Sequence, residues 1–241
     1  MVSRLKGFYG DVARRQNFWI ASEIAGKKVL DVGCGYGLLV DFLRRQDYDV
    51  TGVDLDEDSL THAARLFPKS TILHLDGYDL PYADESFDTV IFRESIHHMD
   101  REKAFREAAR LAKYRIIVFD PNPSPWIKFC RKLAKHVDEE TSFKEVTEAL
   151  KQTGLSIKRA EFLETFAFPA SGGFVGTPLI PNWAWFKKMI LGLDAIVTRG
   201  LQLAHLDRLF CWRFLITADK TKTAKSGYSP SFLHPSHSVP A

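Results

Sequence analysis

Residues 29–37 read VLDVGCGYG, and this run constrains the fold more than any other part of the chain. A short apolar segment contains Asp31, and Gly33, Gly35 and Gly37 then follow at alternate positions before a helical pattern begins. Glycine adopts positive φ without a steric penalty and lets a ligand lie against the backbone. The helix that follows presents free N–H groups at its start. The run therefore predicts a ligand site at the carboxyl end of a parallel strand.

The first 120 residues alternate strand-like and helix-like runs. Apolar runs of strand length occupy 28–32, 49–54, 71–75, 87–92 and 115–119, and helical periodicity marks 8–24, 38–45, 57–66 and 100–112. Asp100 is expected to be the N-cap of the last of these helices. Repeated strand–helix–strand units form right-handed crossovers, so we expect a mostly parallel sheet with helices on both faces.

The second half of the chain departs from this rhythm. We expect helices at 126–136 and 142–151 and strands at 155–162 and 209–217. Residues 165–206, between those two strands, form an expected cap insertion of loop and helix. Its first part, 165–186, carries no charged residue. In its helical part, 182–205, one apolar face is expected to hold Trp183, Phe186, Ile190, Leu193 and Val197.

Composition narrows the class of protein. The chain has 241 residues, and Lys+Arg of 33 against Asp+Glu of 30 gives a formal charge of +3, so nothing points to a nucleic-acid partner. Three scattered cysteines argue against a disulfide framework and structural zinc. No secretory signal or membrane-spanning run is visible, so we expect a cytoplasmic protein. Residues 1–219 are interpreted as one domain, with 25–120 as its cofactor-binding core and 220–241 as a disordered tail.

The competing interpretation of the glycine run is a dinucleotide site. Its fingerprint is G-x-G-x-x-G. Counted from Gly33, the last position of that pattern is Leu38, because the third glycine comes one residue early. An acid directly before the glycines, Asp31, is also foreign to that fingerprint. The sequence therefore disfavours an NAD(P)-dependent oxidoreductase.

The run DVGCGYG and the features that follow it resemble class I (Rossmann-like) S-adenosylmethionine-dependent methyltransferases, in particular the type 11 methyltransferase domain family. The resemblance covers residues 28–119, with weaker likeness through the last two expected strands. It implies an α/β fold with a seven-stranded, mostly parallel sheet whose last strand is antiparallel. It also implies S-adenosyl-L-methionine as cofactor and S-adenosyl-L-homocysteine as product.

The resemblance assigns a set of cofactor-binding residues. Asp54, at the end of the second strand, would accept the ribose hydroxyls, and Leu55 would pack on the adenine; the alternative for Asp54 is an ordinary helix N-cap. Asp76 would accept the adenine amino group, with the backbone of Gly77 beside it, and Asp79 is the rival acid. The backbone carbonyl of residue 93 would accept the methionine amino group. The full expected set is Asp31, Gly33, Gly35, Gly37, Asp54, Leu55, Asp76, Gly77 and Arg93.

Residues at the expected mouth of the site supply the candidates for chemistry. His97 and His98 follow the fourth strand and are the candidate general bases, with structural hydrogen bonding as the alternative role; Glu94 is a weaker candidate. Adjacent histidines rarely face one ion, so no metal site is expected. Tyr9, Arg14 or Arg15 could meet the methionine carboxylate, with a solvated helix face as the alternative.

These observations predict an S-adenosylmethionine-dependent methyltransferase that acts on a small-molecule or lipid-linked acceptor, at oxygen. The acceptor is not identified by the motifs, because a fold does not fix a substrate. The apolar cap beside Lys187 and Lys188 favours a hydrophobic acceptor or peripheral contact with a membrane, with simple packing on the domain as the alternative. The second hypothesis for function is a non-catalytic module that keeps the cofactor fold. Oligomeric state stays open.

Overall fold

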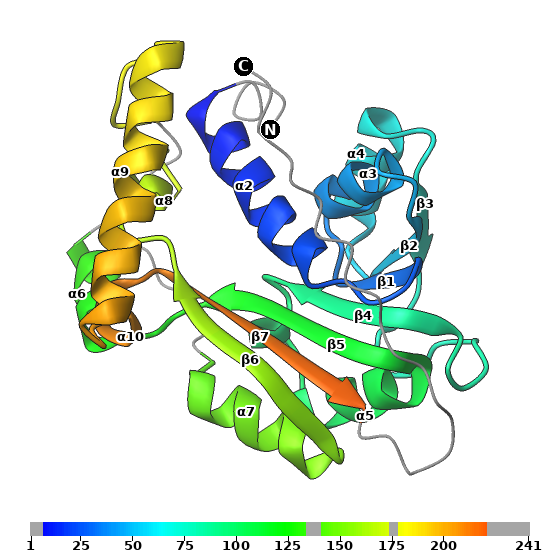
Figure 1. Ribbon diagram of the computed structural model, residues 1–241. Coiled ribbons are helices and arrows are strands. Elements are labelled where there is room, and N and C mark those ends of the chain that lie inside the picture. The colour runs from blue at the N-terminus through cyan, green and yellow to red at the C-terminus, as the bar shows by residue number, and fades with distance from the viewer. Residues whose placement is uncertain (1–6, 134–140, 174–177, 221–241) are drawn as a thin grey trace.

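A seven-stranded sheet organises the molecule (Figure 1). The computed structural model describes residues 7–133, 141–173 and 178–220. The strands are β1 Lys28–Val32, β2 Asp49–Asp54, β3 Thr71–His74, β4 Phe87–Arg93, β5 Ala112–Pro121, β6 Leu155–Leu163 and β7 Arg213–Lys220. Their order across the sheet is β3-β2-β1-β4-β5-β7-β6, and only β7 runs antiparallel to its neighbours. The expected sheet with an antiparallel last strand is confirmed.

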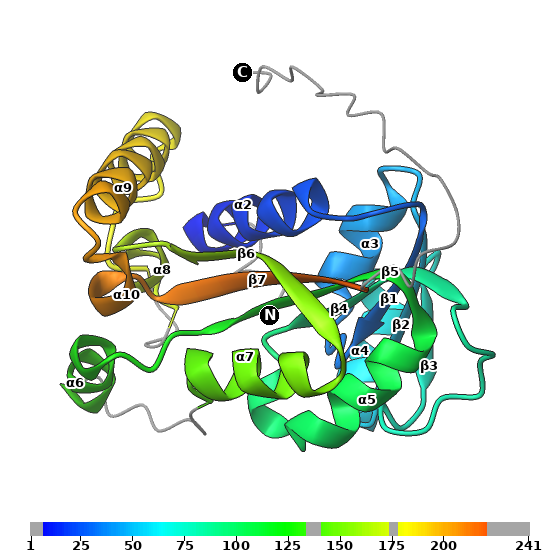
Figure 2. The ribbon, with the colours of Figure 1, turned by 60° about the horizontal axis from the view of Figure 1, so that its bottom comes forward.

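Helices cover both faces of this sheet (Figure 2). They are α2 Phe8–Ser22, α3 Leu38–Arg44, α4 Glu57–Leu66, α5 Arg101–Leu111, α6 Pro125–Leu133, α7 Phe143–Gln152, α8 Ala167–Ala170, α9 Ala184–Leu203 and α10 Asp207–Phe210, with a 3-10 turn η1 at Ile96–His98. Alternate residues of each strand point to opposite faces. Leu30 and Ile116 therefore pack with α5 and α7, whereas Val29 and Ile117 pack with α2 and α3.

The helix boundaries follow local signals. Oδ1 of Asp100 accepts the backbone N–H of Lys103 at 3.2 Å, which confirms Asp100 as the N-cap of α5. Ser142 and Glu145 form a complete capping box at the start of α7. The expected helix at 126–136 begins one residue earlier, at Pro125, because proline suits the first turn of a helix. Of that expected helix, residues 134–136 lie outside the described part of the chain.

The last strand is displaced from its expected position. The prediction of a strand over 209–217 was wrong at its start, because 207–210 forms α10 and β7 begins only at Arg213. Lys220 belongs to β7 rather than to the tail, and its Nζ donates to Oε1 of Glu85 at 2.9 Å. The rest of the expected tail, 221–241, lies outside the described residues.

The cap insertion stands at the carboxyl edge of the parallel strands, where α8, α9 and α10 gather with α6 (Figure 1). The expected apolar loop at 165–186 contains the short helix α8. Of the five residues expected on one apolar face of the long helix, Trp183, Leu193 and Val197 are exposed, and Phe186 and Ile190 are half-buried. The buried side chains of this helix are Asp194 and Thr198, and the apolar pattern placed Asp194 away from the expected face. Among the described residues, no helix is long and apolar enough to cross a membrane.

Candidate active site

The glycine run forms a tight turn between the end of β1 and α3. The backbone N–H groups of Gly33 and Cys34 both donate to the carbonyl of Val53, at 2.8 and 3.0 Å, and this fastens the turn to β2. Gly33, Gly35 and Gly37 have φ of 72°, 50° and 72°. All three therefore lie in the left-handed region that favours glycine.

The three glycines differ in what surrounds them. A Cβ at Gly33 would lie 2.4 Å from Cβ of Ser95, and a Cβ at Gly37 would lie 2.4 Å from Cδ1 of Ile72. These two positions need glycine because protein atoms occupy the space. A Cβ at Gly35 would meet no atom within 4 Å. Gly35 thus exposes bare backbone on the open side of the turn, where a ligand has room to lie against it.

Asp54, at the end of β2, binds the backbone of this turn. Its Oδ2 accepts the backbone N–H of Gly35 at 2.7 Å and its Oδ1 accepts the N–H of Asp56 at 2.9 Å. The N-cap of α4 is Asp56, so the ordinary capping role does not fall to Asp54. The next side chain, Leu55, is 57% exposed and presents an apolar surface beside the turn. A carboxylate has about four acceptor positions, so Asp54 can still accept hydroxyl groups.

Asp31 is a buried acid of the site with a raised pKa. Its side chain is buried, and its Oδ1 has no hydrogen-bond partner among the described residues. Burial raises its pKa to about 7, the positive charge of Arg93 opposes that rise, and the negative charge of Asp54 adds to it. A buried carboxylate oxygen without a donor fits a cationic ligand group. The residues around the turn therefore fit S-adenosylmethionine, whose amino group is such a cation.

The third acid lies on the loop after β3. Asp76 is exposed, and its Oδ1 accepts the backbone N–H of Tyr78 at 3.0 Å. A Cβ at Gly77 would lie 2.8 Å from Cγ1 of Val32 and 3.1 Å from Cε of Met99, so this loop packs closely against the end of β1. The parallel pairing of β3, β2 and β1 thus brings the ends of these strands to one edge.

The two histidines on η1 occupy different environments. His97 is buried, and its Nδ1 lies 2.9 Å from Oδ1 of Asp120, whereas His98 is exposed with its ring centroid 4.0 Å from that of His97. Burial raises the pKa of Asp120 to about 6, although the hydrogen bond and charge of His97 act to lower it. Sequence reasoning missed Asp120. The available signal was an acid at the carboxyl end of β5, the same position that drew attention to Asp54 on β2.

Comparisons with known proteins agree with this geometry. Residues 30–117 match the family described as "Methyltransferase domain". The 27-O-demethylrifamycin SV methyltransferase of Amycolatopsis mediterranei is 31% identical over 61% of this chain and 60% of its own. The ubiquinone biosynthesis O-methyltransferase of Aliivibrio fischeri is 36% identical over 39% of this chain and 42% of its own. Over residues 30–117 the chain is thus similar to the methyltransferase domain family.

A solved structure supports the fold over a greater length. Geranyl diphosphate C-methyltransferase from Streptomyces coelicolor, solved with S-adenosyl-L-homocysteine, superimposes with a TM-score of 0.62 at 18% identity, over 88% of this chain and 82% of its own. At this identity the likeness concerns the fold alone. The two curated alignments, in turn, span 60% and 42% of those relatives. S-adenosyl-L-methionine is the cofactor that the matched methyltransferase domain and this solved structure indicate.

The side chain of Arg93 also lies at the site, where the sequence suggested a role only for its main chain. Its Nη2 donates to Oε1 of Gln16 on α2 at 3.2 Å. Its charge acts on both Asp31 and Glu94. Arg93 therefore links the N-terminal helix to the edge of the sheet that carries the glycine turn.

Glu94 forms an ion pair with Arg213. Nε of Arg213, at the start of β7, donates to Oε1 of Glu94 at 2.8 Å, and Glu94 has φ of 54°. Burial acts to raise the pKa of Glu94, but the positive charges of Arg213 and Arg93 outweigh it and lower that pKa. A carboxylate held in its charged form by two arginines is a poor proton acceptor, so Glu94 does not suit the role of base.

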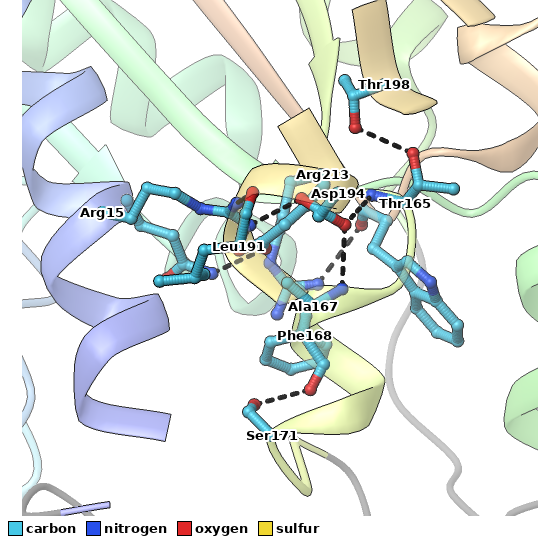
Figure 3. Close-up of polar contacts among 12 residues, drawn as sticks. Arg15, Thr165, Ala167, Phe168, Ser171, Leu191, Asp194, Thr198 and Arg213 are labelled. Atoms are coloured by element: carbon cyan, nitrogen blue, oxygen red, sulfur yellow. Dashed lines mark hydrogen bonds and ion pairs between the residues drawn. The ribbon is translucent and has the colours of Figure 1, made fainter. Parts of the chain in front are cut away.

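Arg15 binds protein carboxylates instead of facing the cofactor. Its Nη2 donates to Oδ2 of Asp194 at 2.7 Å and to Oε1 of Glu164 at 3.1 Å (Figure 3). These contacts fasten α2 to the cap, so the suggested role for Arg15 toward a methionine carboxylate is wrong. Arg14 lies on the exposed face of α2, with its Nη1 4.0 Å from Asp11.

Proposed function

We propose that this chain transfers the methyl group of S-adenosyl-L-methionine to an oxygen atom of a small-molecule or lipid-linked acceptor. One observation carries the proposal. The open backbone of Gly35 donates its N–H to Asp54, and Asp31, the acid just before the same turn, has a buried oxygen without a partner among the described residues. Residues 1–219 would act as one domain in this reaction, with 165–206 as its cap.

Each residue of the site has a role that its surroundings support. Asp54 would accept the ribose hydroxyls with the acceptor positions that Gly35 and Asp56 leave, and exposed Leu55 would lie against the adenine. Asp76 and the backbone of Gly77 would bind the edge of the adenine. Asp31 and the carbonyl of residue 93 would accept the amino group. The cofactor supplies an activated methyl group on a sulfonium, so the protein chiefly positions the acceptor and removes its proton.

His97 is the proposed general base. When its Nδ1–H donates to Asp120, Nε2 carries the lone pair that accepts a proton. Asp120 then fixes the tautomer of the imidazole and stabilises the imidazolium that forms, as a buried carboxylate does in other acid–base pairs. His98 lies exposed on the same turn and is the second candidate.

The acceptor class rests on chemistry and on relatives. Both curated relatives carry names of O-methyltransferases, and a hydroxyl acceptor is the one that needs a base such as His97. The exposed apolar side chains of the cap favour a hydrophobic or lipid-linked acceptor. Reaching a lipid-linked acceptor requires contact with a membrane surface. An NAD(P)-dependent oxidoreductase is not favoured by the glycine spacing or by the relatives.

Two measurements test the proposal. Isothermal titration with S-adenosyl-L-homocysteine should show a single site, and absence of binding at millimolar concentration would remove the proposed function. Extracts incubated with the purified protein and cofactor carrying an isotope-labelled methyl group should yield a labelled small molecule by mass spectrometry. If the cofactor binds but no labelled product forms, and His97→Ala changes nothing, the non-catalytic binding module is the better description.

A further inference from the structure

The long cap helix α9 presents a continuous apolar face to the outside. Its exposed large side chains are Trp185 at 62%, Met189 at 41%, Leu193 at 44%, Ile196 at 70% and Leu203 at 70%. At 100° per residue, these positions fall within one stripe of the helix, together with Gly192 and Gly200. A Cβ at either glycine would meet no atom within 4 Å, so nothing in the described part of the chain covers this stripe there.

Hydrogen bonds of Asp194 attach the opposite face of α9 to the rest of the cap, and this attachment determines which way the apolar stripe faces. Oδ1 of Asp194 accepts the backbone N–H groups of Thr165, Phe166 and Ala167 at 3.0, 2.7 and 2.9 Å. Figure 3 shows Asp194 pointing from α9 toward Arg15 and the start of α8. Since Asp194 lies about 160–180° around the helix from the exposed residues Trp185 and Ile196, the polar anchor forces the apolar stripe outward.

Further apolar groups extend the surface at both ends of α9. Trp183 stacks on Trp185, with ring centroids 6.0 Å apart and planes at 21°, before the first turn of the helix. Beyond its last turn, Leu206 and Leu209 are exposed. Large contiguous apolar patches that are exposed to solvent mark interaction sites for proteins, membranes or ligands.

The charges on this segment are of one sign. Within 178–206 the only acid is Asp194, which is buried. The exposed charged side chains there are Lys188 and Arg199, at the margin of the apolar stripe. Lys187 faces inward instead, where its Nζ lies 2.8 Å from Oδ2 of Asp11. The surface therefore combines tryptophan and aliphatic groups with cations and offers no exposed carboxylate.

We propose that α9 docks on a membrane surface that contains anionic lipids. A helix of 20 residues is about 30 Å long, and its apolar stripe would lie in the plane of the interface. Tryptophans at one end suit the headgroup region, and Lys188 and Arg199 would meet lipid phosphates. Pairing of two α9 helices fits less well, because the second copy would bring the same cations and no exposed acid.

The position of α9 gives this docking a consequence for the proposed function. The helix stands at the carboxyl edge of the sheet, the edge that also carries the glycine turn (Figure 1). Docking through α9 would therefore bring the site close to lipid-linked acceptors. This consequence rests on the proposed function, whereas the docking itself does not.

The test measures binding to vesicles and leaves the cofactor out. The full chain should sediment with phosphatidylglycerol–phosphatidylcholine vesicles and bind much less to pure phosphatidylcholine. Ile196→Glu should weaken binding at least tenfold, because it places a charge in the apolar stripe. The double variant Lys188→Gln/Arg199→Gln should weaken binding about thirtyfold, since each cation near an anionic surface contributes about fivefold.

Matched controls lie on α7, which covers the lower face of the sheet in Figure 2. Gln152→Glu adds the same negative charge as Ile196→Glu, and Lys144→Gln/Lys151→Gln removes the same positive charge; both should bind vesicles like the parent chain. Affinity for S-adenosyl-L-homocysteine should be equal in all variants. Failure of the parent chain to bind anionic vesicles overturns the docking proposal, even if the cofactor binds. A dimer that Ile196→Glu dissociates, without vesicle binding, would assign α9 to self-association instead.

Discussion

The backbone N–H of Gly35 donates to Oδ2 of Asp54 at 2.7 Å, so the acid that ends β2 holds the middle glycine of the turn that follows β1. This contact joins two parts of the sequence that are 19 residues apart. Among the three glycines of this turn, the carboxylate therefore contacts the one at which an added Cβ would meet no atom within 4 Å. The turn and the acid therefore form a single binding element, and damage to either should reach the cofactor.

Asp54→Ala should weaken binding of S-adenosyl-L-homocysteine by about 2–3 kcal/mol. The variant removes an ionised acceptor, and hydrogen bonds to charged groups are worth roughly 1.5–3 kcal/mol each. Isothermal titration measures the change. Asp49→Ala is the matched control, because Asp49 is an exposed acid at the opposite end of β2. Equal affinities for Asp54→Ala and the parent chain would show that the ribose lies elsewhere.

Gly35→Ala and Gly37→Ala should separate binding from folding. Gly35→Ala adds a methyl group to open space, so it should keep the fold at a cost of about 1–2 kcal/mol for its positive φ while it blocks the cofactor. Gly37→Ala would place Cβ 2.4 Å from Ile72 and should destabilise the fold further. Thermal unfolding and titration with S-adenosyl-L-homocysteine distinguish the two effects. A Gly35→Ala variant with unchanged affinity would contradict the proposed position of the ligand.

Asp31 should make cofactor binding depend on pH. Its pKa is raised to about 7 mainly by burial, and a cationic ligand group needs the ionised form. Affinity for S-adenosyl-L-homocysteine should therefore fall as pH is lowered from 8 to 6, by up to tenfold per unit below 7. Asp31→Asn should bind weakly at both pH values. A parent chain whose affinity is flat over this range would exclude Asp31 from contact with the amino group.

Asp31 should also make the stability of the fold depend on pH, but stability should fall as pH rises, whereas cofactor affinity should rise. Because the pKa of Asp31 in the folded chain, about 7, exceeds its ordinary value of 3.8, ionisation of Asp31 destabilises the fold progressively between these two pH values. The full cost is present above pH 7. Asp31→Asn should accordingly raise the melting temperature at pH 8 and leave it nearly unchanged at pH 4. At 1.36 kcal/mol per pKa unit, the gain at pH 8 is at most about 4 kcal/mol.

The sheet and the glycine turn were predictable because their signals are local. A strand of apolar residues, an acid and three glycines depend on neighbours in sequence, and β1, β2 and β4 appeared at the expected positions. The pairing of His97 with Asp120 was not predictable in this way. It joins η1 to the end of β5, 23 residues apart, and only the order of strands in the sheet brings them together.

In the cap, apolar periodicity alone did not predict which face of α9 is buried. The apolar residues of α9 share a face, and burial of that face is the usual outcome. Here the helix turns a single acid inward, because Asp194 meets three backbone N–H groups and Arg15. Those donors come from the end of β6, the start of α8 and α2, and no pattern within α9 announces them.

Asp120→Asn should lower the rate of methyl transfer without changing cofactor affinity. The variant keeps the shape of the side chain but removes the charge that stabilises a protonated His97. We expect the rate to fall by one to two orders of magnitude, and His97→Ala to cost about 10²–10⁴. The rising limb of the pH–rate profile should also move to lower pH in Asp120→Asn. A purely structural role for Asp120 would lower stability and leave that limb in place.

Asp194→Ala should loosen the cap and lower the stability of the whole chain. The side chain of Asp194 is only 1% exposed. Its removal leaves the N–H groups of 165–167 without this acceptor, and leaves Arg15 with Glu164 and the carbonyl of Leu191 as partners. Breaking a buried ion pair from one side costs roughly 3–5 kcal/mol. Urea denaturation should show this loss, whereas Glu148→Ala, in an exposed pair with Lys144, should cost less than about 1 kcal/mol. Equal stability of the two variants would mean that Asp194 does not anchor α9, and the outward direction of its apolar stripe would lose its physical cause.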